Sequence, residues 1–330
     1  ENATSCDKIE PEFALHPSGI SCTIESKLLH EEDSPLRKYE FAHRQAPRRR
    51  IRISRLLLGL ALLCMLAYPF LEPFLLQIDR HTVTIGGLPS GLRGIRIAFV
   101  SDIHQGPFFS QGRVNSLISQ INALSPDIVI LGGDYADDSD GAIEFFRNAP
   151  PLQARLGVRA VVGNHDRTEP ESNFGVLLAE MKNYGALPLN NYADRIKVGQ
   201  SYITIAGVDD YDNGFPDVAG VARQVRQDDF VIFVGHNPDL LAEAFQAVGS
   251  DGDNHWFDLA LFGHTHGGQV TLLGNPIVRK TIPAIGERYL SGWKEENRAH
   301  ILVSNGVGTG VAPVRLFARP QLHLITLKAK

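Results

Sequence analysis

The feature that most constrains the fold is a series of short apolar runs, each followed directly by polar residues. The runs are rich in Val, Ile, Leu and Phe, and a helix-like stretch at 110–124 separates the first two. Short β-branched runs of this kind are typical of buried strands, so the pattern predicts an α/β domain. Further strands are expected within 286–294, 299–308 and 321–329. The runs and their polar ends lie within 95–104, 127–137, 158–166, 201–210, 230–240 and 259–270.

Five of these strand ends carry side chains that commonly bind metals. In an open α/β sheet the carboxyl ends of the strands converge on one crevice, where ligands bind. One histidine after a strand would indicate little, but five such ends are hard to attribute to chance. The neighbouring glycines Gly133, Gly163, Gly235 and Gly263 are expected to let the backbone turn sharply. The residues are Asp102, His104, Asp134, Asn164, His165, Asp166, His236, His264 and His266.

The chemistry of this set indicates a two-metal site. Imidazole and carboxylate without thiolate suit Fe, Mn, Zn or Ni, and Cys6, Cys22 and Cys64 all lie outside the region. The ligands are too many for one ion and about right for two. Asp134 is central in sequence order and is the natural bridging carboxylate. Paired ions clamp the attacking and leaving oxygens of an in-line displacement, which is phosphoryl-ester chemistry. The acidic run Asp137, Asp138 and Asp140 is expected to cap a helix or to lie in solvent.

The motifs resemble those of the calcineurin-like metallophosphoesterases. "DIH", "GGDY", "GNHD", "GH" and "GHTH" occur in the family's order and spacing, and the resemblance covers about Ile95 to Leu327. "GHTHGGQ" and "SNGVGTGVAPVRL", together with an N-terminal anchor, resemble the membrane-associated branch. The resemblance implies a four-layer α/β/β/α sandwich with a dinuclear site at one end.

The same resemblance implies individual roles. Asp102, His104 and His266 match the ligands of a first metal, and Asn164, His236 and His264 match those of a second, with Asp134 bridging. The two ions would be Mn, Fe or Zn. His165 matches the histidine that contacts the phosphate and protonates the leaving oxygen, and Asp166 would orient it. The implied mechanism is attack on phosphorus by a metal-bridging hydroxide.

The N-terminal region predicts a membrane anchor. Leu56–Leu71 carries no charge and follows a basic block of arginines, whereas Pro69, Glu72 and Pro73 interrupt its end. A buried core helix and a signal peptide are the competing interpretations. We expect a disordered extension over 1–50, an anchor helix over 51–79 and the phosphoesterase domain over 80–330. A spanning anchor places the domain outside the cytoplasm by the positive-inside rule, whereas an interfacial one leaves it inside.

The expected function is hydrolysis of a phosphodiester or pyrophosphate at the inner membrane. An anchor favours a lipid-linked substrate, and the resemblance makes UDP-2,3-diacylglucosamine, a lipid A precursor, one candidate. The net charge of −5 gives no indication of a nucleic-acid partner. The alternative is a catalytically weak, metal-stabilised scaffold on the same fold. Loss of a ligand would favour that alternative, and every ligand position is filled.

Overall fold

The computed structural model describes residues 47–330 except 169–170, 227, 279–281 and 311. The extension expected over 1–50 therefore lies outside the described residues, apart from its last four. The chain divides into two compact units, 1–58 and 59–330. The described part of the first unit is the beginning of helix α1 (Pro47–Leu71), and the second unit holds the sheets described below.

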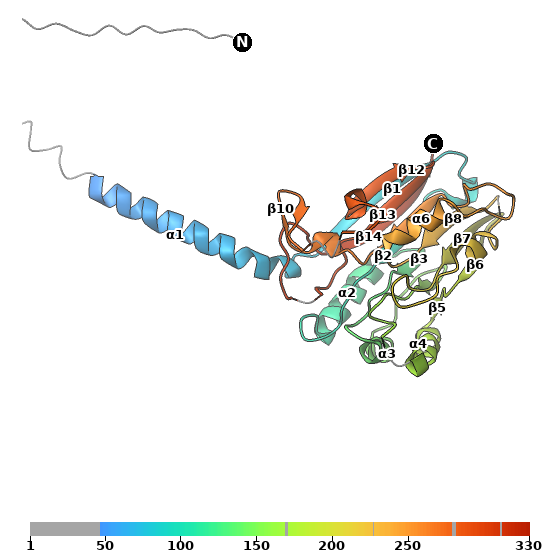
Figure 1. The fold of residues 1–330 in the computed structure, drawn as a ribbon, viewed down its shortest axis with the longest axis horizontal. Coiled ribbons are helices and arrows are strands. Elements are labelled where there is room, and N and C mark those ends of the chain that lie inside the picture. Colours follow the sequence, from blue (N-terminus) through green and yellow to red (C-terminus); the bar gives the residue numbers. More distant parts are fainter. Residues whose placement is uncertain (1–46, 169–170, 227, 279–281, 311) are drawn as a thin grey trace, which may run out of the picture. The chain divides into compact units, whose positions relative to one another are not determined.

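The second unit contains two six-stranded sheets and a small hairpin (Figure 1). The first sheet has the order β1 (Gln77–Ile85), β14 (Gln321–Ala329), β2 (Arg96–Val100), β3 (Ile128–Leu131), β4 (Val158–Ala160) and β5 (Ala186–Pro188). The second has the order β12 (Gly292–Glu296), β13 (Ala299–Val303), β9 (Leu259–Phe262), β8 (Phe230–Val234), β7 (Ser201–Gly207) and β6 (Tyr192–Val198). The hairpin pairs β10 (Thr271–Leu272) with β11 (Asn275–Pro276).

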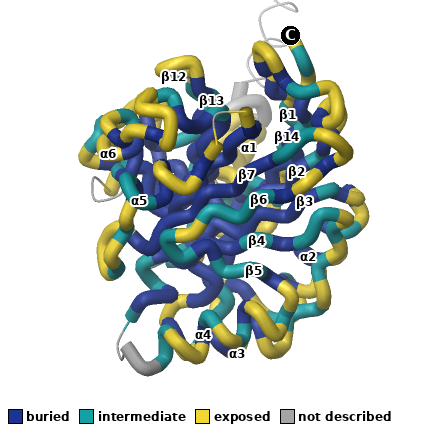
Figure 2. Tube along the Cα trace, turned by 90° about the vertical axis from the view of Figure 1, so that its right-hand side faces the viewer, coloured by how far each residue is buried: buried dark blue, intermediate teal, exposed yellow. Residues whose placement is uncertain are grey.

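Alternation along the strands builds the layers. In β2, Ile97 and Phe99 belong to the cluster between the sheets, whereas Ala98 and Val100 belong to a cluster under the helices. Successive side chains of a strand point to opposite faces, so one apolar run serves both clusters. Three helices cover the first sheet, and two short ones cover the second (Figure 2). They are α2 (Gln111–Ala123), α3 (Ser139–Asn148) and α4 (Glu171–Tyr184), then α5 (Val218–Ala222) and α6 (Leu241–Ala244).

This arrangement confirms the predicted four-layer α/β/β/α sandwich. The six apolar runs form β2, β3 and β4 in one sheet and β7, β8 and β9 in the other, and neighbours within each trio are parallel. The carboxyl ends of each trio therefore lie at a common edge. The helix expected over 110–124 is α2. The sheets are mixed, since β14 is antiparallel to β2 and parallel to β1.

Helix α1 is a single 25-residue helix that contains Pro69 and ends at Leu71, before a 3-10 turn at Glu72–Phe74. The segment Arg52–Phe74, which comprises most of α1 and this turn, is long and apolar enough to cross a membrane, judged by length and composition, and none of its most apolar window is buried. The core helix of a soluble protein is mostly buried, so this exposure favours the anchor over a core helix. Strand β1 begins at Gln77, inside the range expected for the anchor.

Candidate metal centre

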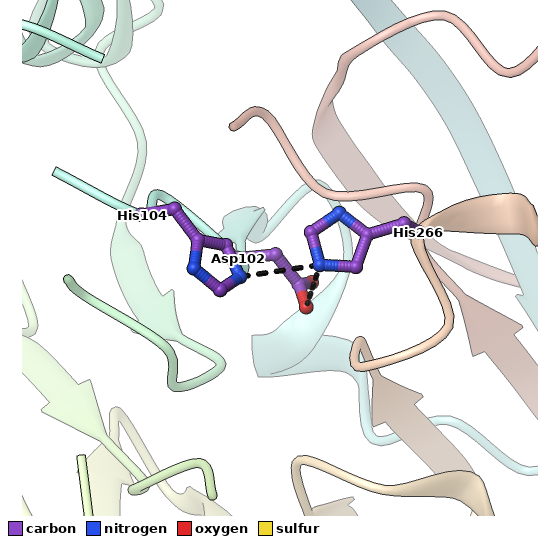
Figure 3. A group of neighbouring side chains, drawn as sticks. All are labelled: Asp102, His104 and His266. Carbon is purple, nitrogen blue, oxygen red and sulfur yellow. Dashed lines mark hydrogen bonds and ion pairs between the residues drawn. The ribbon is translucent and has the colours of Figure 1, made fainter. Parts of the chain in front are cut away.

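The first predicted ligand group is assembled in the structure. Asp102 and His104 lie in the loop after β2, and His266 begins a 3-10 turn (His266–Gly268) after β9. The two Nε2 atoms of His104 and His266 are 3.2 Å apart, and His266 Nε2 is 3.6 Å from Asp102 Oδ1 (Figure 3). One ligand atom from each residue lies within 4.8 Å of the other two, so the three can hold one ion.

Asp134 lies between this group and the second one. Its Oδ2 is 3.5 Å from His104 Nε2 and 3.1 Å from His236 Nε2, so the carboxylate lies between the two imidazoles. His236 comes from the loop after β8 and forms a further group with Asp102 and Asp134. Beside it, His264 Nδ1 is 3.0 Å from Asn164 Oδ1. All seven predicted ligands thus come together at the carboxyl ends of strands from both sheets.

Most of these ligands have an unfavourable backbone conformation. Five of the seven have a positive φ, a region that costs a non-glycine residue about 1–3 kcal/mol. The surrounding fold holds them there: Asp102 N–H donates to the carbonyl of Gly133 (2.9 Å), and His104 N–H donates to that of Asp134 (3.1 Å). The residues are Asp102 (53°), His104 (48°), Asp134 (56°), His264 (68°) and His266 (52°).

The glycines beside the ligands have two different roles. Gly133 has a φ of 90°, so it turns the chain as expected. Gly163 and Gly263 serve close approach, because a Cβ at Gly163 would overlap Asp134 Oδ1 and one at Gly263 would overlap Asp102 Oδ2. These two positions leave room for the ligand carboxylates.

The electrostatics of the site fit cations. Asp102 Oδ2 is buried and finds no hydrogen-bond partner among the described residues. Burial works against a charge on His104, yet Asp137, Asp134 and Asp102 raise its pKa above the ordinary value. Burial likewise opposes a charge on His236, and Asp134 and Asp102 raise its pKa strongly. The carboxylates favour positive charge at this position, which protons on the imidazoles or bound metal ions could supply. The donor set therefore fits the two metal ions that the sequence predicts.

His165 and Asp166 do not form the pair that the sequence suggested. His165 Nδ1 is 2.9 Å from the carbonyl oxygen of Asp137, and the backbone N–H of His165 donates to Asp134 Oδ1 (3.0 Å). The Asp166 carboxylate turns instead to the backbone. Its Oδ2 accepts from the N–H groups of Asp134 (2.7 Å) and Gly163 (2.8 Å), and its Oδ1 accepts from that of Tyr135 (2.9 Å). Asp166 therefore supports the loop that carries Asp134.

Sequence reasoning missed residues that contact the predicted ligands, among them Asp137 and Arg315. Asp137 Oδ1 is 3.1 Å from His104 Nδ1 and fixes that ring. Its neighbour Asp138 caps α3 as expected, by accepting from Gly141 N–H (2.7 Å), and nothing in the acidic run distinguished the two.

Another missed residue is Arg315, whose guanidinium is fully buried. It donates to the carbonyls of Gly308 and Asn305, and its Nη2 is 3.4 Å from His266 Nδ1. It lies in the "SNGVGTGVAPVRL" segment, where the sequence offered a resemblance but no role.

Comparisons with known proteins place these observations in a family. Residues 95–268 match the family model described as calcineurin-like phosphoesterase. An uncharacterized metallophosphoesterase of Aquifex aeolicus is 32% identical over 80% of this chain and 96% of its own length. Phosphodiesterase YaeI of Escherichia coli is 29% identical over 78% of this chain and 90% of its own. The transmembrane protein with metallophosphoesterase domain of Danio rerio is 26% identical over 74% of this chain and 56% of its own.

Proposed function

Because the chain belongs to the calcineurin-like phosphoesterase family and is a metal-dependent phosphohydrolase, we propose that it cleaves a lipid-linked phosphodiester or pyrophosphate with two metal ions. The observation that carries the proposal is the position of Asp134 Oδ2 between His104 and His236, where the carboxylate would bridge two ions. Bound there, two divalent cations would activate water for attack and offset the charge on the phosphoryl oxygens.

We assign the ligands in two sets that share Asp134. Asp102, His104 and His266 would hold the first ion, and their ligand atoms lie mutually within 4.8 Å. Asn164, His236 and His264 would hold the second. Burial and the neighbouring His104 and Arg315 lower the pKa of His266 well below its ordinary value, which keeps its imidazole neutral as metal binding requires.

We propose that His165 transfers a proton during the reaction. Since the carbonyl of Asp137 can only accept a hydrogen bond, His165 Nδ1 carries a hydrogen, and Nε2 is the atom that takes up and releases a proton. We propose that the protonated ring gives the Nε2 proton to the leaving oxygen, a step worth about 10²–10⁴-fold in rate. Asp137 would then position two rings, that of His165 through its carbonyl and that of His104 through its carboxylate.

The activity is tested with bis-p-nitrophenyl phosphate and added Mn²⁺, a water-soluble diester that requires no lipid recognition. The parent should hydrolyse it, and Asp134→Asn should abolish hydrolysis. Asp127→Asn is the matched control, because Asp127 accepts from Arg96 N–H (2.9 Å) just before β3, at the opposite end of the strands. A parent that is inactive with every metal tried would overturn the proposal and favour the scaffold alternative.

The lipid-linked substrate is supported by the apolar segment Arg52–Phe74 and by the names of relatives such as the Danio rerio transmembrane protein. We propose a membrane location, with α1 as a single anchor and with the catalytic domain following it, β1 included. Fusions of alkaline phosphatase and of a fluorescent protein to the carboxyl terminus report on which side of the membrane the catalytic domain lies. A domain outside the cytoplasm would rule out UDP-2,3-diacylglucosamine, since nucleotide-linked lipids are cytoplasmic, and would leave other lipid phosphodiesters.

A further inference from the structure

A group of exposed apolar side chains lies beside the end of α1 and is separate from the proposed metal ligands. We call it the apolar rim; it comprises the hairpin side chains and Phe317. Figure 1 shows β10 close to the last turns of α1. Exposed apolar side chains that gather in one place mark a surface for binding, whereas isolated ones need no explanation. The members are Leu272, Leu273, Ile277, Val278 and Phe317.

Backbone hydrogen bonds tie the hairpin to the end of α1. The N–H of Thr271 donates to the carbonyl of Leu316 (2.9 Å), and the N–H of Arg315 donates to the carbonyl of Pro69 in α1 (2.9 Å). Arg315 and Leu316 are adjacent in the sequence, so these two bonds hold the hairpin close to Pro69.

Phe317 is tied to the same helix end by a buried carboxylate. Glu72 is fully buried, and its two oxygens accept from the N–H groups of Phe317 (2.9 Å) and Ala318 (2.8 Å). The ring of Phe317 also packs near that of Tyr68, with 6.3 Å between centroids. A buried charge normally requires such partners, and here they fix the apolar rim to residues 68–72.

Two members of the rim have conformations that their side chains disfavour. Leu273 has a φ of 53° and is 91% exposed, and Phe317 has a φ of 55° and is 66% exposed. Glycine, asparagine and aspartate are the usual residues at such positions of a tight hairpin or turn. Neither turn formation nor core packing explains a leucine and a phenylalanine there. A contact with an apolar medium outside the protein does.

The length of α1 indicates which medium this is. The segment Arg52–Phe74 has 23 residues, which is about 35 Å of helix against a hydrocarbon thickness of about 30 Å. If this segment crosses a bilayer, residues 68–74 emerge at its surface. The rim is bonded to those residues and therefore lies at the same depth.

We propose that the apolar rim inserts into the interfacial layer of the membrane that α1 crosses, so that its partner is the lipid surface. The inference rests on the membrane attachment in the proposed function and adds a second contact to it. It also places the metal centre, because the hairpin begins five residues after His266 and Arg315 donates to the carbonyl of His266 (3.4 Å). Phosphoesters carried by lipids of that membrane are the substrates nearest to such a site.

The test measures the depth of residue 273 without relying on catalysis. The full chain carrying Leu273→Trp is placed in nanodiscs made with lipids brominated near the headgroup end of the acyl chains, and fluorescence quenching is recorded. The parent, which contains only Trp256 and Trp293, gives the background. Val248→Trp is the matched control, because Val248 is also an exposed apolar side chain, 46% exposed, but lies between α6 and β9.

We expect several-fold stronger quenching at residue 273 than at residue 248. Equal quenching at the two positions would overturn the inference. So would a tryptophan at 273 that is shielded from aqueous acrylamide but not quenched by the lipid, since that result means that a second copy covers the rim. Phe317→Trp repeats the measurement if the hairpin variant does not fold. Failure to hydrolyse the soluble diester would reject the proposed function alone, because quenching needs no turnover.

Discussion

The Asp166 carboxylate offers the sharpest test of how the centre is supported. Its three hydrogen bonds come from buried backbone N–H groups of the loops that carry Asp134 and Gly163. In Asp166→Asn the amide oxygen can replace Oδ2 and keep the bonds from Asp134 and Gly163, but the amide NH₂ then faces Tyr135 N–H. One buried donor is left without a partner, at a cost of about 1–3 kcal/mol in the free energy of unfolding.

Asp166→Ala leaves all three donors unsatisfied and should cost roughly three times as much. Both variants should also weaken Mn²⁺ binding by about 10–100-fold, since removal of groups that orient metal ligands typically has that effect. The assays are urea unfolding followed by the fluorescence of the buried Trp256, and Mn²⁺ titration by calorimetry on the full chain in detergent. Asp127→Asn again serves as the control and should leave Mn²⁺ affinity unchanged. Parent-like Mn²⁺ affinity in Asp166→Asn, or equal weakening in the control, would refute the reasoning.

Three further outcomes are expected. His165→Ala should lower kcat by about 10²–10⁴-fold with both metals still bound; loss of a metal on elemental analysis would instead make His165 a ligand. Exhaustive chelation should abolish hydrolysis and lower the melting temperature, and Mn²⁺ should restore both; activity that survives chelation would contradict the two-metal assignment. Burial opposes the charge of Asp229, but Arg195 (2.7 Å) and the Thr204 hydroxyl (2.6 Å) hold its pKa below the ordinary value. The Asp229 carboxylate therefore makes its full contribution to the free energy of unfolding above the pKa of the unfolded state. This contribution is lost as the pH falls through the pKa of the folded state. Asp229→Asn should flatten the acid limb of stability against pH, and an unchanged limb would count against this account.

The strands and the gathering of the candidate ligands at one edge could be predicted because both depend on local sequence. Each apolar run is long enough to form one buried strand, and each ligand follows its strand within a few residues. Parallel neighbours then bring those ends to one edge whatever the details of the loops, as the pairing of β2, β3 and β4 shows.

The supporting contacts could not be predicted because they join distant segments through side-chain orientation. Asp166 was expected to face His165, its neighbour in sequence. Its buried carboxylate instead accepts hydrogen bonds from three backbone N–H groups. Arg315 reaches His266 across 49 residues, and Glu72 reaches Phe317 across 245. A motif identifies what a residue type can do, whereas these contacts depend on which groups are left unsatisfied after the chain has folded.

The left-handed backbone at five proposed ligands bears on how such a protein changes over generations. Glycine adopts this backbone conformation without the steric cost that these five residues carry, and metal binding would offset that cost in the folded chain. A copy of the gene released from catalysis would gain stability by exchanging Asp102, His104 or His264 for glycine. In a relative, glycine at these positions would therefore mark the loss of the metal centre, whereas this chain has aspartate or histidine at all five.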